Sequence, residues 1–133
     1  MSASRQSDLK NTILARLPAH DFAVVRPLLE RVAVTSGSML QSAGEPAKSV
    51  LFIETGIISL LAPLEHGGRI EIGHVGREGA AGIHAALGAG TLTSEIMAQS
   101  DGTAFRADAA ALRVIAEQSA PFRQALNGFA NVL

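Results

Sequence analysis

The spacing of hydrophobic positions changes twice along the chain, near residues 31 and 108. Before the first change, hydrophobic residues recur at intervals of three and four, which predicts helices. Between the two changes they form short runs rich in β-branched residues, separated by glycine-containing turns, which predicts strands. Helical spacing returns after residue 108. The predicted order is therefore helices, about eight strands, and helices again.

The first 31 residues divide into a polar arm and a helical region. Residues 1–7 are polar and are predicted to be flexible. Helical spacing over 8–17 predicts a first helix, and Pro18 is well placed to open a second. Pro27 falls inside the second helical pattern, so this helix is expected to be short or kinked. We therefore predict a helical region over residues 8–31.

Residues 32–107 have the pattern of a β-roll. Strands are predicted at 32–35, 39–41, 49–54, 57–64, 69–74, 95–99 and 103–107. Phe52 is expected to anchor the interior of the roll. In the strand at 69–74 the residues alternate, which predicts a half-buried strand with Ile70, Ile72 and His74 facing inward. The predicted fold class is α+β, an antiparallel β-roll of the double-stranded β-helix, jelly-roll or cupin-like kind.

Residues 108–133 are predicted to form the C-terminal helices. Asp108 can cap one helix and Pro121 can open the last one. In this last helix four large hydrophobic residues form a heptad-like seam, namely Phe122, Leu126, Phe129 and Leu133. The seam favours a dimerisation helix over simple core packing. Because it stops at Leu133, we expect the last helix to be truncated and the chain to be part of a longer protein.

Composition narrows the class of protein. The chain has 133 residues, a net charge of −1 and 11 Lys and Arg residues. Because these basic residues are scattered and form no stripe, we do not expect the chain to bind DNA itself. The absence of cysteine excludes disulfides, thiolate-held iron–sulfur clusters and a catalytic thiol. No signal peptide or apolar run near 18 residues is present, so we expect a single cytoplasmic domain with no membrane contact.

A glycine-dense stretch at 76–94 is the strongest candidate for a binding site. It contains a run of small residues and lies between predicted strands. A glycine-rich turn that leads into a short helix, here roughly 81–87, presents free backbone N–H groups to an anion. The stretch is therefore a candidate anion cradle.

Four segments, in this order, resemble the effector domain of the Crp/Fnr transcription regulators. They are the turn at 42–47 (SAGEPA), the strand and turn at 50–56 (VLFIETG), the segment at 73–79 (GHVGREG) and the strand-to-helix exit that begins at 105–108 (FRAD). The resemblance covers residues 17–133. It implies the cyclic-nucleotide-binding fold, with 76–94 as its phosphate-binding cassette. Gly44 and Gly56 fit turns in which the roll must bend sharply.

The cassette departs from the pattern of the family members that bind cyclic AMP. Those proteins have a Glu after a Gly for the ribose, and ten residues later an Arg for the phosphate, followed by Ser or Thr. Alignment on Gly82 places Ile83 at the Glu position, Thr93 at the Arg position and Ser94 at the hydroxyl position. Loss of the Arg contact alone should cost about 1.5–3 kcal/mol of binding free energy. We therefore expect no cyclic AMP binding in the usual mode.

Two interpretations of the cassette stay open. Its small residues, its hydroxyl groups and His84 can serve a different ligand, or the cassette can be only a structural cap on the roll. His20 and His66 are expected to be solvated, and His74 to be buried and hydrogen-bonded. A haem-sensing regulator would need an axial ligand, but nothing selects His74 or His84 for that role.

The resemblance implies the N-terminal sensory domain of a Crp/Fnr-like regulator, which is not an enzyme and needs no cofactor or metal. Its expected partners are a small-molecule effector of unknown identity, a second copy bound through the C-terminal helix, and DNA through a helix-turn-helix absent from this chain. One alternative is a small cupin-like enzyme with His74, His84 and Glu71 or Glu78 on a metal. Cupins typically carry a His-x-His pair, which this sequence lacks. Another alternative is a ligand-free interaction module.

Overall fold

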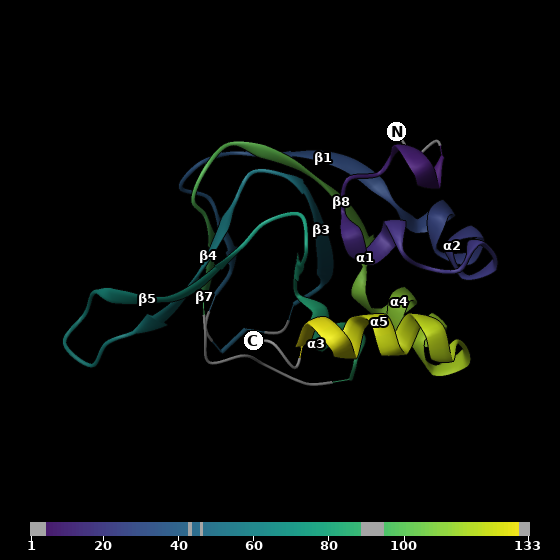
Figure 1. Ribbon diagram of the computed structural model, residues 1–133. Helices are drawn as coiled ribbons and strands as arrows, with labels where there is room; N and C mark the ends of the chain where they lie inside the picture. Colours follow the sequence, from purple (N-terminus) through teal and green to yellow (C-terminus); the bar gives the residue numbers. More distant parts are fainter. Residues whose placement is uncertain (1–4, 43, 46, 89–94, 131–133) are drawn as a thin grey trace.

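The computed structural model describes residues 5–42, 44–45, 47–88 and 95–130, and its strands form a roll with helices gathered at one side (Figure 1). The helical elements are η1 (Gln6–Asp8), α1 (Thr12–Ala15), α2 (Ala19–Val25), η2 (Arg26–Leu28), α3 (Ile83–Ala86), α4 (Ala109–Gln118) and α5 (Ala120–Ala130). The strands are β1 (Glu30–Val34), β2 (Met39–Gln41), β3 (Ser49–Thr55), β4 (Ile58–Pro63), β5 (Arg69–Val75), β6 (Ala80–Ala81), β7 (Glu95–Ala98) and β8 (Gly102–Asp108). The predicted α+β roll is confirmed.

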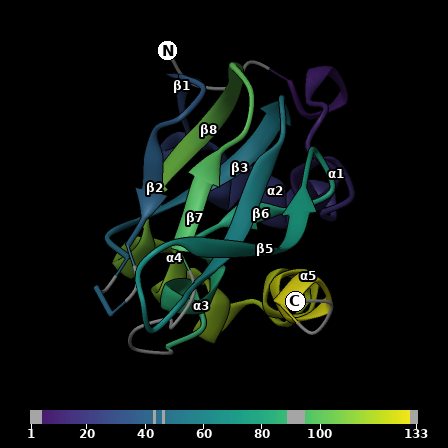
Figure 2. The ribbon, with the colours of Figure 1, turned by 90° about the vertical axis from the view of Figure 1, so that its left-hand side faces the viewer.

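Two antiparallel sheets of four strands make up the roll. Their strand orders are β1-β8-β3-β6 and β2-β7-β4-β5, so chain neighbours such as β3 and β4 lie in different sheets. Figure 2 shows the strands of both sheets in front, with α1 and α2 behind them. β3 and β8 pair from Ser49 opposite Asp108 to Thr55 opposite Thr103, which joins the start of the roll to its exit.

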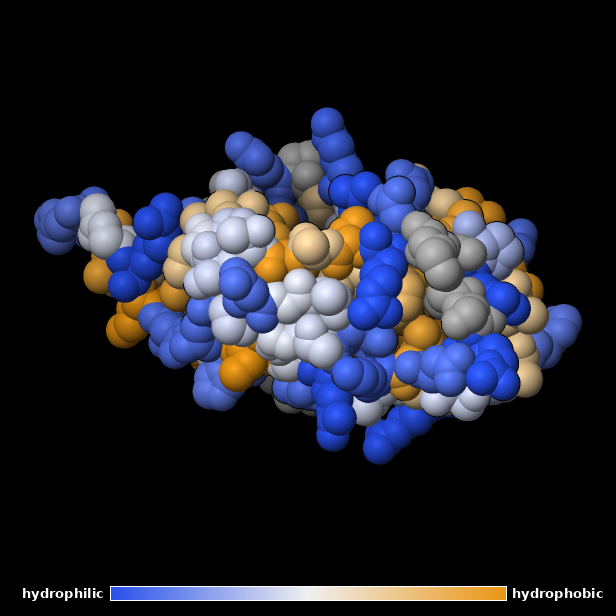
Figure 3. All heavy atoms as spheres, turned by 90° about the horizontal axis from the view of Figure 1, so that it is seen from above, coloured by the Kyte–Doolittle hydropathy of each residue, from blue (hydrophilic) through white to orange (hydrophobic). Residues whose placement is uncertain are grey.

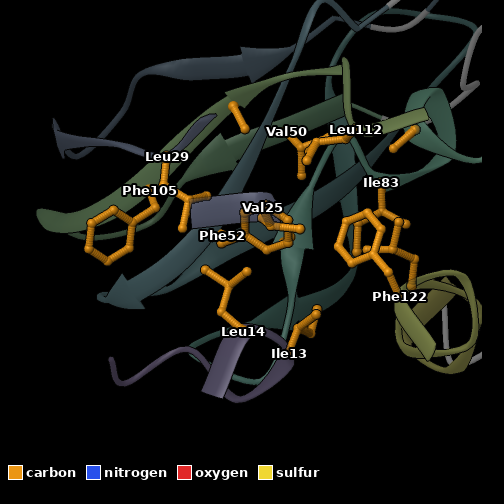
Figure 4. Close-up of a cluster of buried hydrophobic side chains, with 14 of the residues drawn as sticks. Ile13, Leu14, Val25, Leu29, Val50, Phe52, Ile83, Phe105, Leu112 and Phe122 are labelled. Carbon is orange, nitrogen blue, oxygen red and sulfur yellow. The ribbon is translucent and has the colours of Figure 1, made fainter. Parts of the chain in front are cut away.

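Two hydrophobic clusters lie on opposite faces of the first sheet. The inner cluster, between the two sheets, contains Val34, Ile53, Ile58, Val75, Ala81, Ile96, Ala98 and Ala104. The outer cluster joins the other face of β3 and β8 to the helices (Figure 4). Phe52 is fully buried in the outer cluster. Its predicted place in the roll interior is therefore wrong, because alternation along β3 directs Ile53 inward and Phe52 toward the helices.

The N-terminal segment begins its contacts with the fold at Gln6. The Gln6 side-chain amide donates to the carbonyl oxygens of Leu14 (3.0 Å) and Leu17 (2.6 Å), although the sequence predicts a flexible arm up to residue 7. The first α-helix starts only at Thr12, later than predicted, because the Asn11 side chain accepts the first free N–H groups. The second helix starts after Pro18 and gives way to a 3-10 turn at Pro27, as predicted.

The sharp turns of the roll fall on glycines. Gly56 has φ +91°, and a Cβ atom there would lie 2.9 Å from the carbonyl oxygen of Asp101. Only glycine fits such a turn without strain. Gly44, with φ +79°, also confirms the predicted bend.

The strand predicted at 69–74 exists as β5, but its predicted burial is wrong. Ile70 and Ile72 are 53% and 57% exposed, and His74 is also exposed. β5 is the edge strand of its sheet, and the β4–β5 hairpin projects beyond the roll (Figure 1). Seen from above, the projecting end of the molecule carries hydrophobic atoms on its surface (Figure 3). Period-two alternation therefore identified the strand but not how far the opposite sheet would cover its face.

The C-terminal helices close the outer cluster. The Asp108 carboxylate caps α4 by accepting from the N–H of Ala111 (2.9 Å), as predicted, and Leu112 is fully buried. Phe122 and Leu126 attach α5 to the same cluster. In the described part of the chain, none of the helices has the length and apolar character needed to cross a bilayer.

Candidate functional site

The cassette helix α3 begins at a position that requires glycine. Gly82 has φ +85°, and a Cβ atom there would lie 2.5 Å from the carbonyl oxygen of Ser49. The resulting helix is a single turn, Ile83–Ala86, shorter than the predicted 81–87. The close approach of Gly82 to β3 therefore fixes where the cassette leaves the roll.

Ile83 follows Gly82 and points into the hydrophobic core. It is 1% exposed and lies in the outer cluster near Leu112 and Phe122 (Figure 4). Cyclic-AMP-binding relatives are expected to have a ligand-binding Glu at this position. Here the position packs the cassette helix against α4 and α5.

The structure brings together only some of the predicted cassette residues. Gly82, Ile83 and the half-buried His84 lie together on α3, whereas Thr93 and Ser94 lie outside the described residues. A cation does lie beside the far end of α3, because guanidinium nitrogens of Arg113 come within 3.4 Å of a Cβ built on Gly88. Arg113 also pairs with Glu117 at 3.4 Å.

A cluster of buried hydrogen bonds, here called the polar node, holds residues 76–79. These residues form the loop at the start of the cassette, which we call the cassette loop. Asn11 is fully buried, and its side-chain amide donates to the carbonyl oxygens of Ile53 (2.8 Å) and Gly79 (2.9 Å). The carboxylate of Glu54, 4% exposed, accepts from the backbone N–H groups of Lys10 (2.9 Å) and Asn11 (2.6 Å). The node links α1, β3 and the cassette loop. Sequence reasoning missed it, although an Asn before an apolar run is a signal for a helix cap.

Phe129 attaches α5 to the same loop. A Cβ atom built on Gly79 would lie 2.1 Å from Cε1 of Phe129, so the ring occupies the space that a side chain would need. Phe129 is partly buried and contacts both hydrophobic clusters. The cassette loop is thus held by Asn11 on one side and by Phe129 on the other.

The predicted dimer seam is divided between core and surface. Phe122 and Leu126 are 0% exposed within the single chain, so they already serve as core. Phe129 is half-buried, and Leu133 lies outside the described residues. A role for the seam in dimerisation therefore stays a prediction, and it depends on Phe129 and Leu133 rather than on the two buried residues.

Four ion pairs are found among the described residues. His20 and His66 are exposed as predicted, but His74 is exposed rather than buried. Among residues 5–42, 44–45, 47–88 and 95–130, no group of three His, Asp or Glu side chains could hold a metal ion. Glu95, at the exit of the cassette, pairs with Arg69, and this hydrogen bond raises the pKa of the Arg69 guanidinium.

Among the cavities that open on the described surface, two have volumes of about 420 and 590 Å³. One, of about 420 Å³, lies between β1 and the loop after β2, where Arg106 is already paired with Glu30. The other, of about 590 Å³, lies between β5, α1 and α5, and Phe129 is among its lining residues. The second cavity therefore touches the helix that holds the cassette loop.

The comparisons with known proteins agree with this geometry. The family profile described as "Cyclic nucleotide-binding domain" matches residues 31–119, which run from β1 to the end of α4. No curated protein matches the chain.

Several solved structures share the fold. The N-terminal domain of a transcriptional regulator from Streptomyces coelicolor A3(2) has a TM-score of 0.69 and 18% identity, over 92% of this chain and 87% of that chain. The sensor domain of the transcriptional regulator DNR from Pseudomonas aeruginosa has a TM-score of 0.70 and 13% identity, over 90% of this chain and 81% of that one.

A third relative is much longer than this chain. The regulatory subunit of a cAMP-independent protein kinase A from Trypanosoma brucei has a TM-score of 0.67 and 14% identity, over 92% of this chain. This chain spans only 41% of that subunit. At these identities the structural neighbours show the fold alone, whereas the profile covers two thirds of the sequence. The chain therefore belongs to the cyclic nucleotide-binding domain family.

Proposed function

We propose that this chain is the sensory domain of a Crp/Fnr-like transcription regulator whose effector is not cyclic AMP bound in the usual mode. The observation that carries the proposal is the attachment of α5 to the cassette loop through Phe129 and Gly79. A domain of this family that joins its binding loop directly to its C-terminal helix has the connection that a sensor needs. Domains of this family are typically regulatory rather than catalytic.

The structural neighbours support a role in transcription. Two of them, from Streptomyces coelicolor and Pseudomonas aeruginosa, are domains of transcriptional regulators, and this chain covers most of each. In a regulator, α5 would continue toward a DNA-binding module and carry the change in the roll to it. We place such a protein in the cytoplasm, where its DNA is.

The buried Ile83 argues against cyclic AMP. A ligand-binding Glu at this position would have to leave the core that Ile83 now fills. A precedent for the fold without the ligand exists, because the Trypanosoma brucei subunit is described as cAMP-independent and a mutant of it with three substitutions as bound to cAMP. In our proposal, the cassette of this chain is likewise kept in shape without its usual ligand contacts.

The signal would travel as a shift between two populations. An effector that moves the cassette loop must change the contact of Gly79 with Phe129, and so the position of α5. The opposite side of the loop stays anchored to Asn11, so α5 is the element free to respond. A second copy of the chain would pair through α5 and its continuation, with Phe129 and Leu133 at the contact.

The test is to map, in the host cell, the DNA that the native protein binds. Crosslinking followed by immunoprecipitation and sequencing should recover a small set of promoter regions. A matched Phe129→Ala strain should change the occupancy of those promoters, because α5 loses its contact with the loop. Recovery of a bound protein kinase without promoter DNA would contradict the proposal and favour a kinase regulatory subunit.

A further inference from the structure

The cavity between β5, α1 and α5 lies outside the cassette. Its volume is about 590 Å³, which falls within the range of about 300–1,000 Å³ usual for small-molecule sites. Three elements distant in sequence form its walls: α1 with the residues that follow it, the β4–β5 hairpin and α5. The cassette residues Gly82, Ile83 and His84 do not line it.

Most of the cavity wall is hydrophobic. Ile13, Leu17 and Val75 form buried parts of it, and Phe129 forms a half-buried part. Ile72, which also lines the cavity, is 57% exposed. A bound apolar group would remove this side chain from water, which is a favourable change.

The rim of the cavity carries a cation that is available for a ligand. Arg16 is exposed and lines the cavity, and none of the ion pairs among the described residues includes it. The exposed His74 and Gln124 also line the cavity and add polar groups to its wall. The one carboxylate, Glu78, is turned back toward its own loop, where it accepts from the backbone N–H of Gly76 at 3.0 Å.

From this arrangement we infer that the cavity binds an amphipathic organic anion, with an aliphatic body against the hydrophobic wall and one carboxylate paired with Arg16. A carboxylate can form a charge-assisted, bidentate bond with a guanidinium group. The smaller crevice is a weaker candidate, because its Arg106 is already paired with Glu30.

A ligand in this cavity would act on α5, the helix through which the proposed sensor transmits its signal. A ligand in this cavity contacts β5 on one side and α5 on the other, so it holds α5 against the roll. This consequence rests on the proposed function, whereas the binding itself does not.

Decanoate is the probe, titrated into the isotope-labelled chain and followed by amide NMR spectra. Decanoate should shift amide signals of β5 and α5, and decanol, which lacks the charge, should bind about tenfold more weakly. Arg16→Gln should reduce decanoate affinity to that of decanol, whereas Arg5→Gln, at an arginine away from the cavity, should leave it unchanged.

Gly128→Leu tests the location of the site. Gly128 is an exposed helical residue that lines the cavity, and a Cβ atom there meets nothing within 4 Å, so the larger side chain fills the cavity without a clash at the backbone. We expect this variant to fold and to lose decanoate binding. Asn127→Leu adds the same side chain one residue away, at an exposed position that does not line the cavity, and should keep binding.

Three results would overturn the inference. They are no decanoate binding at millimolar concentration, binding that survives Gly128→Leu, and equal binding of decanoate and decanol. Self-association of the chain that Gly128→Leu abolishes, without decanoate binding, would instead assign the cavity to a second copy. None of these results affects the promoter mapping, so failure here and failure of the proposed function are distinguishable.

Discussion

Ile83 lies where the resemblance predicts a ligand-binding Glu, but its side chain is part of the hydrophobic core. Only 1% of Ile83 is exposed. This core position is physically reasonable because a one-turn helix has little intrinsic stability and depends on packing. Ile83 therefore ties the cassette helix to α4 and α5.

Ile83→Glu should destabilise the fold rather than restore a nucleotide site. Burial of a carboxylate without a partner is expected to cost about 3 kcal/mol or more of unfolding free energy. The matched change Ile83→Val, which removes one methyl group, should cost only about 0.5–1.5 kcal/mol. Because the chain lacks Trp and Tyr, urea unfolding is best followed by circular dichroism. Similar midpoints for the two variants would mean that position 83 is not part of the core.

Asn11 has two separable roles, as a helix cap and as a buried donor. Asn11→Ser keeps an oxygen that can cap α1 but loses the amide that donates to Ile53 and Gly79. It should cost about 1–3 kcal/mol, because the buried carbonyl groups of Ile53 and Gly79 each lose a hydrogen bond. Asn11→Ala should cost about 1 kcal/mol more, since it also removes the cap. The measurement is urea unfolding, with the exposed Asn127→Ala as control, and equal stability of the Ser variant and the wild type would exclude the donor role.

At the scale of elements, α5 is attached to the roll by a close contact between a ring and a glycine. Gly79→Ala places a methyl group against the ring of Phe129 and Cγ1 of Val75, so these side chains must shift, and we expect the shift of the ring to loosen α5. The same substitution in a Phe129→Ala background should cost less. The coupling between the two changes should fall in the range of about 0.5–3 kcal/mol that contacting residues show.

Hydrogen exchange provides a second readout of this attachment. Gly79→Ala should accelerate exchange of the α5 amides, while those of the paired strands β3 and β8 keep their protection. Gly73→Ala is the matched control, because a Cβ atom at Gly73 meets nothing within 4 Å. Additive stability effects and unchanged α5 exchange would contradict the proposed route from the cassette loop to α5.

Most elements of the fold could be predicted from the sequence, but their burial could be predicted less well. Proline and glycine positions located the second helix and the turns, because these residues restrict or extend the backbone locally. Ile70 and Ile72 alternate like a buried face, yet their exposure depends on where β5 lies in its sheet. The direction of Phe52 likewise depends on which face of β3 the helices cover.

The candidate site was predictable only in part, for the same reason. The short helix of the cassette follows from the local glycine-rich pattern, although it spans only Ile83–Ala86 instead of the predicted 81–87. The contacts of Gly79 with Asn11 and Phe129 join segments 68 and 50 positions apart in the sequence. Such contacts leave no periodic signal in a single chain, so only the structure shows that the cassette loop is held from both sides.

At the scale of the whole molecule, the roll, the cassette and α5 form one connected unit. The outer cluster runs from α1 through β3 and β8 to α4 and α5, so the cassette helix rests on the same core as the C-terminal helix. The family profile of the cyclic nucleotide-binding domain covers the roll, the cassette and α4 of this unit. The predicted departure is in the ligand chemistry, because the buried Ile83 lies where the resemblance predicts a carboxylate.

Differential scanning calorimetry of the chain with and without cyclic AMP tests this account most directly. A ligand present at 100 times its Kd stabilises the folded state by about 2.7 kcal/mol, which would raise Tm by several degrees. We predict no change in Tm when cyclic AMP is present at millimolar concentration. A clear rise in Tm at low micromolar cyclic AMP would contradict the account, because it would require a nucleotide site that does not use position 83 as a ligand.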